Sequence, residues 1–594
     1  VRLCGQQDIT VQAIPGCCAA VCALAVSGLP TGRFCFEGFL SANKKERRAR
    51  LEELRGEERT MVFHEAPHKL RPTLADMLEV LGDRPVALCR ELTKLHEETV
   101  RTTLSRAVAL YQEKEPRGEY VLVVAGAQRA AGPAVPRGRS DLPMIPCTIQ
   151  EICAAVGGTL LQDSHAAITG VTTDSRAVSA GQLFIPLTGE RFDGDAYIDA
   201  ALTGGAEGCL TARRPDKLLP HKAYVLVEDT RLALGALAAW YRSRFTLPVV
   251  QITGSAGKTT TKEMVAAVLS QRYDTLKTQA NYNNDIGTPL TLLNLTPQHE
   301  AAVIETGMNH FGEIRYLGGL VRPDIAVITN VGDAHIENLG NTRQGILQAK
   351  CEIFEHLPPD GLAVLNGDDP LLNTVALPQT VLRCGRGEGC QIRVTDVDNC
   401  GIEGISCTVT TARGSYRLHT ASPGAYMIYP MAMAAAIGEV LGLAAAEITA
   451  GVASYVPTGS RMRVLHLPEG RLLIDDCYNA NPQAMTEALK LLSVTPSRRR
   501  LAVLGDMGEL GELTVSAHRA IGALAGELHI DAVIAVGEKA RGIAAEAPNA
   551  QWYAAAEDAL PAVRAAFGPD TALLVKASHA MHMETIVKEL EAQT

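Results

Sequence analysis

The chain has 594 residues, of which 46% are hydrophobic and 21% are charged, and its formal net charge is −10. This length predicts several domains of ~150 residues each, and the acidic balance argues against a general affinity for nucleic acid or anionic membranes. The 15 cysteines include no CxxC pair, which favours a reducing environment over a disulfide framework. No apolar stretch reaches the ~20 residues that a transmembrane helix needs, so we expect a cytoplasmic protein without a membrane span.

The first block covers residues 1–126, and a segment rich in Ala, Gly, Pro and Arg predicts a linker over residues 127–142. The distinctive stretches of this block are IPGCCAAVCALAVSGLPTGRFCFEGFL, VFHEAPHKL and CRELTKLHEE. They resemble the carboxyl-terminal part of the small-subunit rRNA ribose 2′-O-methyltransferases, which have the tetrapyrrole-methylase fold. The resemblance implies an α/β lobe in which Pro15 and Gly16 supply one wall of a cleft for S-adenosylmethionine.

We expect this lobe to be truncated and to have no methyltransferase activity by itself. The chain starts at Val1 in helical-looking text, which suggests that the preceding lobe of that family is missing, and S-adenosylmethionine would bind only with that lobe present. The charge run Lys44–Arg50 has two interpretations, an rRNA contact or a solvated helix. Interleaved glutamates favour the solvated helix, so we do not expect rRNA binding here.

Two further seams, near Phe245–Pro248 and Val456–Met462, predict domains over residues 143–245, 246–457 and 458–594. From Leu247, short apolar runs such as VVQI, AAVIE, DIAVI and GLAVLN alternate with helical patterns. The last block repeats this alternation with RRLAVLGD, DAVIAVG and ALLVKAS. Such alternation is typical of βαβ units with a parallel sheet, whose ligand sites lie at the carboxyl ends of the strands.

The stretch ITGSAGKTTTKEM, residues 252–264, predicts a phosphate-binding loop between a strand and a helix. Gly254 and Gly257 allow a tight turn whose N–H groups face phosphate oxygens, and Lys258 adds a positive charge. The Thr259 hydroxyl is placed to bind Mg²⁺ at the start of the helix. The common pattern has about four residues between its glycines, whereas only Ser255 and Ala256 stand between them here.

Glu305 ends the apolar run AAVIE, and His335 follows the run DIAVI through TNVGDA. Each residue by itself fits either a solvated strand end or loop residue, or a functional side chain. On strands that flank the phosphate-binding loop, both become candidate ligands for the metal that bridges nucleotide phosphates. Histidine is an unusual ligand for a hard cation, so its assignment needs further support.

From Met144 to the end, the chain resembles the ATP-dependent Mur ligases of peptidoglycan synthesis. The matching stretches are GSAGKTTTKEM, QANYNNDIGTPL, IETGMNHFGEI, ITNVGDAHIENLG, AKCEIF, LNGDDP, DDCYNANPQAM and VLGDMGELG. DDCYNANP and GDMGELG are most similar to the branch that adds D-alanyl-D-alanine, because other branches carry an element like DYAHNP. The resemblance implies three domains: a UDP-binding α/β domain, a central parallel-sheet ATPase domain and a Rossmann-like C-terminal domain.

The resemblance also implies further site residues. Lys350 matches a helix lysine that is carbamylated in the family, which turns an ammonium into an oxygen ligand. The family then implies two Mg²⁺ ions, one held with Thr259 and Glu305, the other with Glu305, His335 and carbamylated Lys350. Implied ATP contacts, beside Gly254, Ser255, Ala256, Gly257, Lys258, Thr259 and Thr260, are Asn366, Asp369, Arg461 and Asp476. Implied substrate contacts are Ser175, Arg176, Asn283, Asn284 and Thr306. The stretch around Ser175 and Arg176 also fits a capped turn before a buried strand.

Three stretches depart from the family pattern. GxHNxxN is replaced by GAYMIYP, with Tyr426, Met427 and Pro430; DGHxF becomes DGDAY, with Asp195; and KGSRxM becomes KASHAM, with His579. These changes bear on the nucleotide, UDP and dipeptide contacts, whereas the phosphate and metal residues are kept.

We therefore expect an ATP-dependent ligase that joins D-Ala-D-Ala to UDP-N-acetylmuramoyl-tripeptide through an acyl phosphate, as a monomer. The alternatives are a sibling Mur or folylpolyglutamate-type ligase, a fusion that also methylates rRNA, and a non-catalytic scaffold. The third residue of the tripeptide, lysine or diaminopimelate, is left open.

Overall fold

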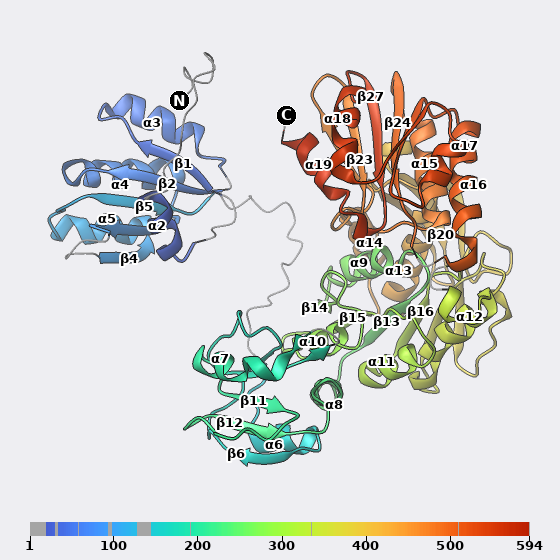
Figure 1. The fold of residues 1–594 in the computed structure, drawn as a ribbon, viewed down its shortest axis with the longest axis horizontal. Coiled ribbons are helices and arrows are strands. Elements are labelled where there is room, and N and C mark those ends of the chain that lie inside the picture. Colours follow the sequence, from blue (N-terminus) through green and yellow to red (C-terminus); the bar gives the residue numbers. More distant parts are fainter. Residues whose placement is uncertain are drawn as a thin grey trace. The chain divides into compact units, whose positions relative to one another are not determined.

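The computed structural model describes residues 19–29, 34–57, 59–92, 98–126, 144–189, 192–333, 336–508 and 510–592. The chain divides into two compact units, Val1–Ala134 and Val135–Thr594 (Figure 1). The predicted linker over 127–142 lies outside the described residues, as do Pro15, Gly16 and His335. Among the described residues, no helix is both long and apolar enough to cross a membrane.

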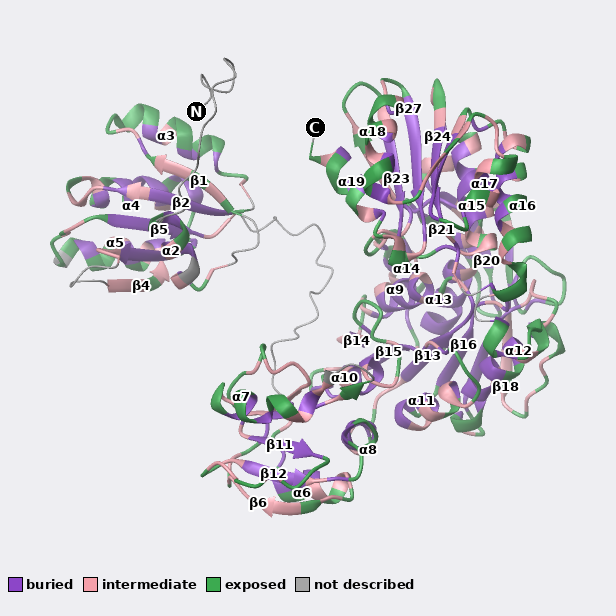
Figure 2. Cartoon of the chain, in the orientation of Figure 1, coloured by how far each residue is buried: buried purple, intermediate pink, exposed green. Residues whose placement is uncertain are grey.

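The first unit is built on a five-stranded sheet of order β1-β2-β5-β3-β4. β1 runs parallel to β2, and the other neighbours are antiparallel. Its apolar cluster around Leu51, Leu70 and Leu122 joins α3, α4 and α5 to the sheet, and a smaller cluster joins α2 to it (Figure 2). The elements are α2 (Ala19–Val26), β1 (Phe34–Phe39), α3 (Lys44–Glu53), β2 (Thr60–Glu65), α4 (Pro67–Leu81), β3 (Pro85–Arg90), β4 (Glu98–Thr103), α5 (Leu104–Glu113) and β5 (Tyr120–Val124).

The Lys44–Arg50 run forms most of α3, as the helical interpretation predicted, but the helix is not wholly solvated. Arg47 is buried, because its guanidinium pairs with Asp76 of α4 at 2.6 Å. Arg48 pairs with the exposed carboxylate of Glu79 on the same helix. Arg47 and Arg48 therefore join α3 to α4.

The second unit begins with a five-stranded sheet of order β6-β12-β11-β8-β7. One continuous apolar cluster joins this domain to the next: it includes Leu237 of α8 and Leu317 of α11. Near residue 245, where a domain boundary was predicted, the chain thus passes from one sheet to the next, and the two domains share one apolar core. The elements are α6 (Ile149–Ala155), β6 (Thr159–Gln162), β7 (Gly170–Thr172), β8 (Gln182–Phe184), β9 (Thr188–Gly189), β10 (Phe192–Asp193), η1 (Gly194–Tyr197), α7 (Ile198–Thr203), β11 (Gly208–Thr211), β12 (Ala223–Leu226) and α8 (Thr230–Arg242).

The middle domain has a nine-stranded sheet of order β14-β15-β13-β16-β17-β18-β19-β20-β21. The strands from β14 to β19 are parallel, and the four in the centre, β15, β13, β16 and β17, are largely apolar, as expected for strands buried on both faces. β13, β15, β16 and β17 are buried along their whole length, which confirms the predicted βαβ pattern. The antiparallel extension β19–β21 was not predicted.

The helices of the middle domain fill in around that sheet. The apolar run after Ala425 forms α13, which is buried along most of its length and packs against α9. Pro430 lies in its first turn, where no helical N–H is required. The elements are β13 (Val249–Thr253), α9 (Lys258–Leu269), β14 (Thr275–Lys277), α10 (Gly287–Leu292), β15 (Ala301–Glu305), α11 (Glu313–Val321), β16 (Ile325–Ile328), η2 (Ile336–Asn338), α12 (Arg343–Cys351), η3 (Glu352–His356), β17 (Leu362–Asn366), η4 (Leu372–Thr374), β18 (Thr380–Gly385), β19 (Ile392–Asn399), η5 (Gly401–Glu403), β20 (Ile405–Thr410), β21 (Ser415–Thr420), η6 (Ala425–Met427), α13 (Ile428–Val440) and α14 (Ala445–Ala453).

The last domain has a six-stranded sheet of order β22-β23-β27-β24-β25-β26, parallel except for β22. Helices cover both of its faces, and each face has its own apolar cluster. The elements are β22 (Arg463–Leu467), β23 (Arg471–Asp476), α15 (Pro482–Val494), β24 (Arg499–Gly505), η7 (Gly511–Leu513), α16 (Thr514–Glu527), β25 (Ala532–Val536), α17 (Arg541–Glu546), β26 (Ala550–Tyr553), α18 (Ala556–Ala566), β27 (Thr571–Lys576), η8 (His579–Met581) and α19 (Glu584–Glu591).

Candidate active site

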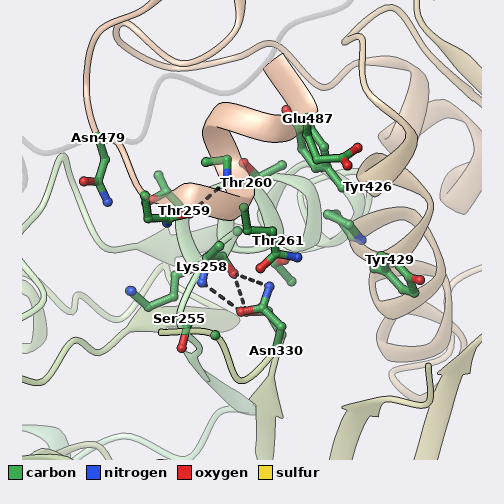
Figure 3. Close-up of a pocket in the computed structure, with 18 of the residues that line it drawn as sticks. Ser255, Lys258, Thr259, Thr260, Thr261, Asn330, Tyr426, Tyr429, Asn479 and Glu487 are labelled. Atoms are coloured by element: carbon green, nitrogen blue, oxygen red, sulfur yellow. Dashed lines mark hydrogen bonds between the residues drawn. The ribbon is translucent and has the colours of Figure 1, made fainter. Parts of the chain in front are cut away.

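A cavity of about 1030 Å³ lies between the middle and last domains, at the carboxyl ends of their strands. The middle domain contributes the loop between β13 and α9, the ends of β15, β16 and β17, and the start of α13 (Figure 3). The last domain contributes Arg461, Asp476, Lys576 and the start of α15. This position agrees with the strand-end location predicted for ligand sites in such sheets.

The phosphate-binding loop connects β13 to α9. Gly257 adopts the left-handed backbone conformation at φ 76°, directly before the helix begins at Lys258. Gly254 has no room for a side chain, since a Cβ there would lie 1.8 Å from the Thr329 hydroxyl. The Lys258 ammonium donates to the Gly254 carbonyl at 2.8 Å and also lines the cavity. The loop thus presents a helix N-terminus and a lysine to the cavity, which suits a phosphate group.

Glu305 lies at the end of β15, and only 2% of its surface is exposed. Asn283 donates to its Oε1 at 2.8 Å, while its Oε2 has no hydrogen-bond partner among the described residues. Carboxylate and hydroxyl oxygens are the ligands that Mg²⁺ prefers, so Glu305 and Thr259, which both line the cavity, fit a magnesium ion.

A buried lysine beside Glu305 was not predicted. Lys262 has no exposed surface; its ammonium donates to the Thr278 carbonyl at 2.6 Å and lies 3.1 Å from Glu263 and 3.7 Å from Glu305 Oε2. Lys277 forms a further ion pair with Glu263. In the sequence, Lys262 follows Lys258 by four residues, a spacing that places both side chains on one side of α9. This spacing could have indicated Lys262 as a further residue near the phosphate-binding loop.

Lys350 lies on α12 and is 2% exposed. Burial, together with the positive charge of Lys258, holds the pKa of its amine well below the usual range. The sequence alone predicted a helix lysine here without indicating its burial. Such a shift favours the neutral amine, whose nitrogen keeps its lone pair.

The last domain brings a second set of charges to the cavity. The Arg461 guanidinium lies 3.8 Å from the ring centroid of Tyr478, and Asp476 pairs with the Lys576 ammonium at 2.6 Å. Burial raises the pKa of Asp476, and Lys576 opposes that rise. Tyr478 and Lys576 were not predicted as site residues, although both stand in stretches that resembled the Mur ligases.

Family descriptions match most of the chain. "Mur ligase family, catalytic domain" matches residues 167–242, "Mur ligase middle domain" residues 252–438 and "Mur ligase, glutamate ligase domain" residues 460–579. The UDP-N-acetylmuramoyl-tripeptide–D-alanyl-D-alanine ligases of Escherichia coli and Bacillus subtilis are each 37% identical over 75% of this chain and 99% of their own length. The chain belongs to the Mur ligase family.

Solved structures agree with this assignment. MurF from Acinetobacter baumannii superimposes with a TM-score of 0.71 at 32% identity, over 76% of this chain and 99% of that one. MurF from Thermotoga maritima in complex with ADP gives a TM-score of 0.64 at 29% identity, over 72% and 98%. Residues 1–108 of this Mur ligase match the description "Tetrapyrrole (Corrin/Porphyrin) Methylases", as the resemblance of the first block implied.

Asn366 and Asp369, which were expected near the nucleotide, form hydrogen bonds with the loop after β17. The carboxylate of Asp369 accepts from the Val331 N–H at 2.8 Å and the Leu371 N–H at 2.9 Å, so it ties this loop to the one after β16. Asn366 accepts from the Asp368 N–H at 3.0 Å. Both residues line the cavity, and their contact with a nucleotide stays a prediction.

The GAYMIYP departure of this Mur ligase lies at the cavity wall. Tyr426, Tyr429 and Pro430 all line it, and the Tyr429 hydroxyl donates to Asp368 at 3.0 Å. Burial, and then the charge of Asp368, raises the pKa of Tyr429 to about 12, so the hydroxyl remains a donor at neutral pH. An aromatic wall thus stands where the family carries polar side chains.

The predicted substrate residues are divided in the structure. Asn283 lines the cavity, whereas Asn284 caps the start of α10 by accepting from the Gly287 N–H at 2.8 Å. Thr306 is fully buried and accepts from the Gln251 amide at 3.1 Å, so its hydroxyl does not line the cavity. The substrate role expected for Thr306 and Asn284 therefore has no support from their positions.

The UDP-side residues lie in the first domain of the second unit. Arg176 is exposed and pairs with Asp174 at 2.9 Å, in the loop after β7 that also contains Ser175. Asp195, which replaces the family histidine, lies 4.0 Å from the Arg213 guanidinium.

His579, which replaces an arginine, lies in the last domain and stacks on Tyr478 with 5.4 Å between the ring centroids.

Proposed function

We propose that this chain joins D-Ala-D-Ala to UDP-N-acetylmuramoyl-tripeptide at the expense of ATP, in the cytoplasm and as a monomer. The supporting observation is a single cavity that combines the Lys258 loop, Glu305 and the Arg461 side of the last domain, in a chain 37% identical to ligases with this named activity. The Lys or diaminopimelate form of the tripeptide is not distinguished by these residues.

The reaction proceeds in two steps. The terminal carboxylate of the tripeptide attacks the γ-phosphorus of ATP, which gives an acyl phosphate and releases ADP. The amine of D-Ala-D-Ala then attacks the acyl carbon, loses a proton and expels inorganic phosphate, so that one amide bond forms for each ATP cleaved.

The chain's own residues position and neutralise charge during these steps. The Lys258 ammonium and the first turn of α9 face the transferring phosphoryl group, and Arg461 approaches it from the last domain. Mg²⁺, when bound, screens the phosphate oxygens from the attacking carboxylate. Thr259 and Glu305 would hold one ion, and Glu305, His335 and a carbamylated Lys350 the other. Closure of the last domain over the cavity would keep water from the acyl phosphate.

The proposed carbamylation of Lys350 can be tested directly. Its lowered pKa favours the neutral amine, which can attack CO₂, lose one proton and become a carbamate with two oxygen donors. ¹³CO₂ added to the protein should give a carbamate carbon signal in ¹³C NMR that the Lys350→Ala variant lacks. An identical signal in the variant would contradict this assignment.

The decisive assay measures ADP formation with UDP-N-acetylmuramoyl-tripeptide, with and without D-Ala-D-Ala. Sustained turnover is expected only with the dipeptide. Replacing D-Ala-D-Ala by glutamate or diaminopimelate tests whether the chain is a sibling or folylpolyglutamate-type ligase. Faster turnover with either of these acceptors than with D-Ala-D-Ala would overturn the present proposal. Gel filtration with light scattering tests the monomer.

We propose no methyl transfer by the first unit alone. The matched family description covers residues 1–108, and the described part of this unit is one five-stranded sheet with its helices. Transfer of a labelled methyl group from S-adenosylmethionine to ribosomal subunits by the purified chain would refute this.

A further inference from the structure

The phosphate-binding loop makes an unusual set of hydrogen bonds with the segment that follows β16. The Ser255 N–H donates to the Asn330 carbonyl at 3.1 Å, and the Ala256 N–H donates to the Asn330 side-chain oxygen at 2.8 Å. The Asn330 amide then returns a hydrogen bond to the Ala256 carbonyl at 3.2 Å (Figure 3). One asparagine thus engages both N–H groups at the loop's apex and one of its carbonyls.

Thr329, the residue before it, strengthens the same contact. Its hydroxyl donates to the Ala256 carbonyl at 2.6 Å, and its N–H donates to the Thr253 carbonyl at 3.0 Å, which continues the pairing of β16 with β13. Thr329 is also the residue that a Cβ on Gly254 would strike. The loop is therefore held at Ser255 and Ala256 against the segment that follows β16.

These bonds change which N–H groups can meet a phosphate. In a common phosphate-binding loop the backbone N–H groups of the loop itself surround the anion. Here the N–H groups of Ser255 and Ala256 already have acceptors, because the loop is short and Asn330 occupies its apex. The first helical bond of α9 runs from the Thr261 N–H to the Gly257 carbonyl at 2.9 Å. Helix geometry therefore leaves the preceding first-turn N–H groups, such as those of Thr259 and Thr260, without a partner inside the helix.

We infer that Asn330 is a positioning residue for nucleotide binding. It holds the loop in the shape in which phosphate is bound by the first turn of α9 and Lys258, and it withholds the N–H groups of Ser255 and Ala256 from the ligand. Because the loop is shaped before the nucleotide arrives, little ordering is required on binding. This inference rests on the nucleotide binding proposed above. It adds which backbone amides bind the phosphate, and that Asn330 positions the loop for them.

Amide hydrogen exchange, resolved to single residues, tests the assignment of the N–H groups directly. In the full-length protein without nucleotide, the amides of Ser255 and Ala256 should already exchange slowly. Addition of ADP should slow exchange at Thr259 and Thr260 and leave Ser255 and Ala256 unchanged. New protection of Ser255 and Ala256 by ADP would overturn the inference. A wild-type protein that binds no ADP would instead refute the proposed function, while the slow exchange of the free loop would still report on Asn330.

Two substitutions test the positioning role. Asn330→Ala should speed exchange at Ala256, whose acceptor it removes, whereas Ser255 keeps the backbone carbonyl of residue 330 as its acceptor. Because two side-chain hydrogen bonds to the loop are lost, the KM for ATP should rise about tenfold, with the KM for D-Ala-D-Ala within about twofold of wild type. Asn330→Asp should keep the acceptor for the Ala256 N–H but place an oxygen against the Ala256 carbonyl and a negative charge near the phosphates. Its KM for ATP should therefore rise further than that of Asn330→Ala.

Asn294→Ala is the matched control, because its side-chain amide also donates to a backbone carbonyl, that of Leu290 at 3.0 Å, but on the exposed end of α10. It should leave both KM values unchanged. If Asn330→Ala only lowers the melting temperature, with loop exchange and the KM for ATP as in wild type, Asn330 is merely structural and the inference fails. Should Asn330→Ala not fold, Asn330→Asp, with its near-identical shape, is measured instead: exchange at Ala256 should stay slow because its acceptor is kept, and the KM for ATP should still rise because the bond to the Ala256 carbonyl is lost. An unchanged KM for ATP would then overturn the inference.

Discussion

Both units of this chain bury charged side chains in α/β layers, but the two units differ in the partners that these charges have. In the first unit, Arg47 has Asp76 as its partner at 2.6 Å, and Arg84 donates to the carbonyls of Leu81 and Arg55. In the middle domain, one Glu305 oxygen has no hydrogen bond from any residue that the structure describes and only the Lys262 ammonium at 3.7 Å, and Lys350 is buried near the like charge of Lys258.

Burial of a charge costs free energy unless partners compensate it. Where the chain supplies the partners itself, the buried charge serves the fold. Where it leaves them incomplete beside a cavity, the arrangement is suited to an external ion or phosphate. Four substitutions test this difference.

The largest effect is expected for Lys258→Ala. Ligation, measured as ADP release dependent on D-Ala-D-Ala, should fall about 10³-fold, because a preorganised positive charge at the phosphoryl group is lost. Arg48→Ala, which removes a surface ion pair of the first unit, should leave the rate unchanged. Equal losses in the two variants would show that the contrast between the units is mistaken.

Lys350→Met separates function from stability within the middle domain. Activity should fall about 10²-fold, an effect of the size seen when an electrostatic group of an active site is lost. The melting temperature should stay level or rise, since an apolar side chain of similar length replaces a buried amine. A variant that retains activity would remove Lys350 from the site; one that unfolds would make it a structural residue.

Arg47→Met makes the corresponding change in the first unit and should give the opposite result. It leaves the buried Asp76 carboxylate with only the longer ion pair to Arg48, at 3.6 Å, so this unit should lose about 3 kcal/mol of unfolding free energy. The ligase rate should remain within about twofold of wild type. Calorimetry that resolves the transitions of the two units, together with the ADP assay, measures both. A stable variant would mean that Asp76 finds other partners.

The smallest effect concerns pH and the last domain. The His518 ring accepts from the Met507 N–H at 3.0 Å, and burial lowers its pKa below the usual 6.5. The unfolded chain therefore binds a proton that the folded chain does not, and stability is lost as pH falls below about 6.5. The drop in melting temperature between pH 7.5 and 5.5 should be smaller in His518→Gln than in wild type. An equal drop would exclude His518 as its cause.

Local patterns were sufficient to predict much of the second unit. The apolar runs at 249–253, 301–305, 325–328 and 362–366 became adjacent parallel strands, because burial on both faces requires a continuous apolar sequence. The glycines of the phosphate-binding loop could be read in the same way, since their conformations depend on near neighbours. The Mur ligase assignment followed from the same short stretches and is confirmed by the matched relatives.

The buried parallel strands, the glycine turn before α9 and the family were thus predictable from the amino-acid sequence, whereas the antiparallel extension β19–β21 was not. The burial of Lys262, Lys350 and Thr306, and the hydrogen bonds of Asn330 to the loop's apex, became visible only in the folded chain. The physical reason is distance along the chain. A turn or a strand depends on residues a few positions apart, whereas burial and hydrogen-bond partners depend on segments that meet only after folding, such as Ala256 and Asn330.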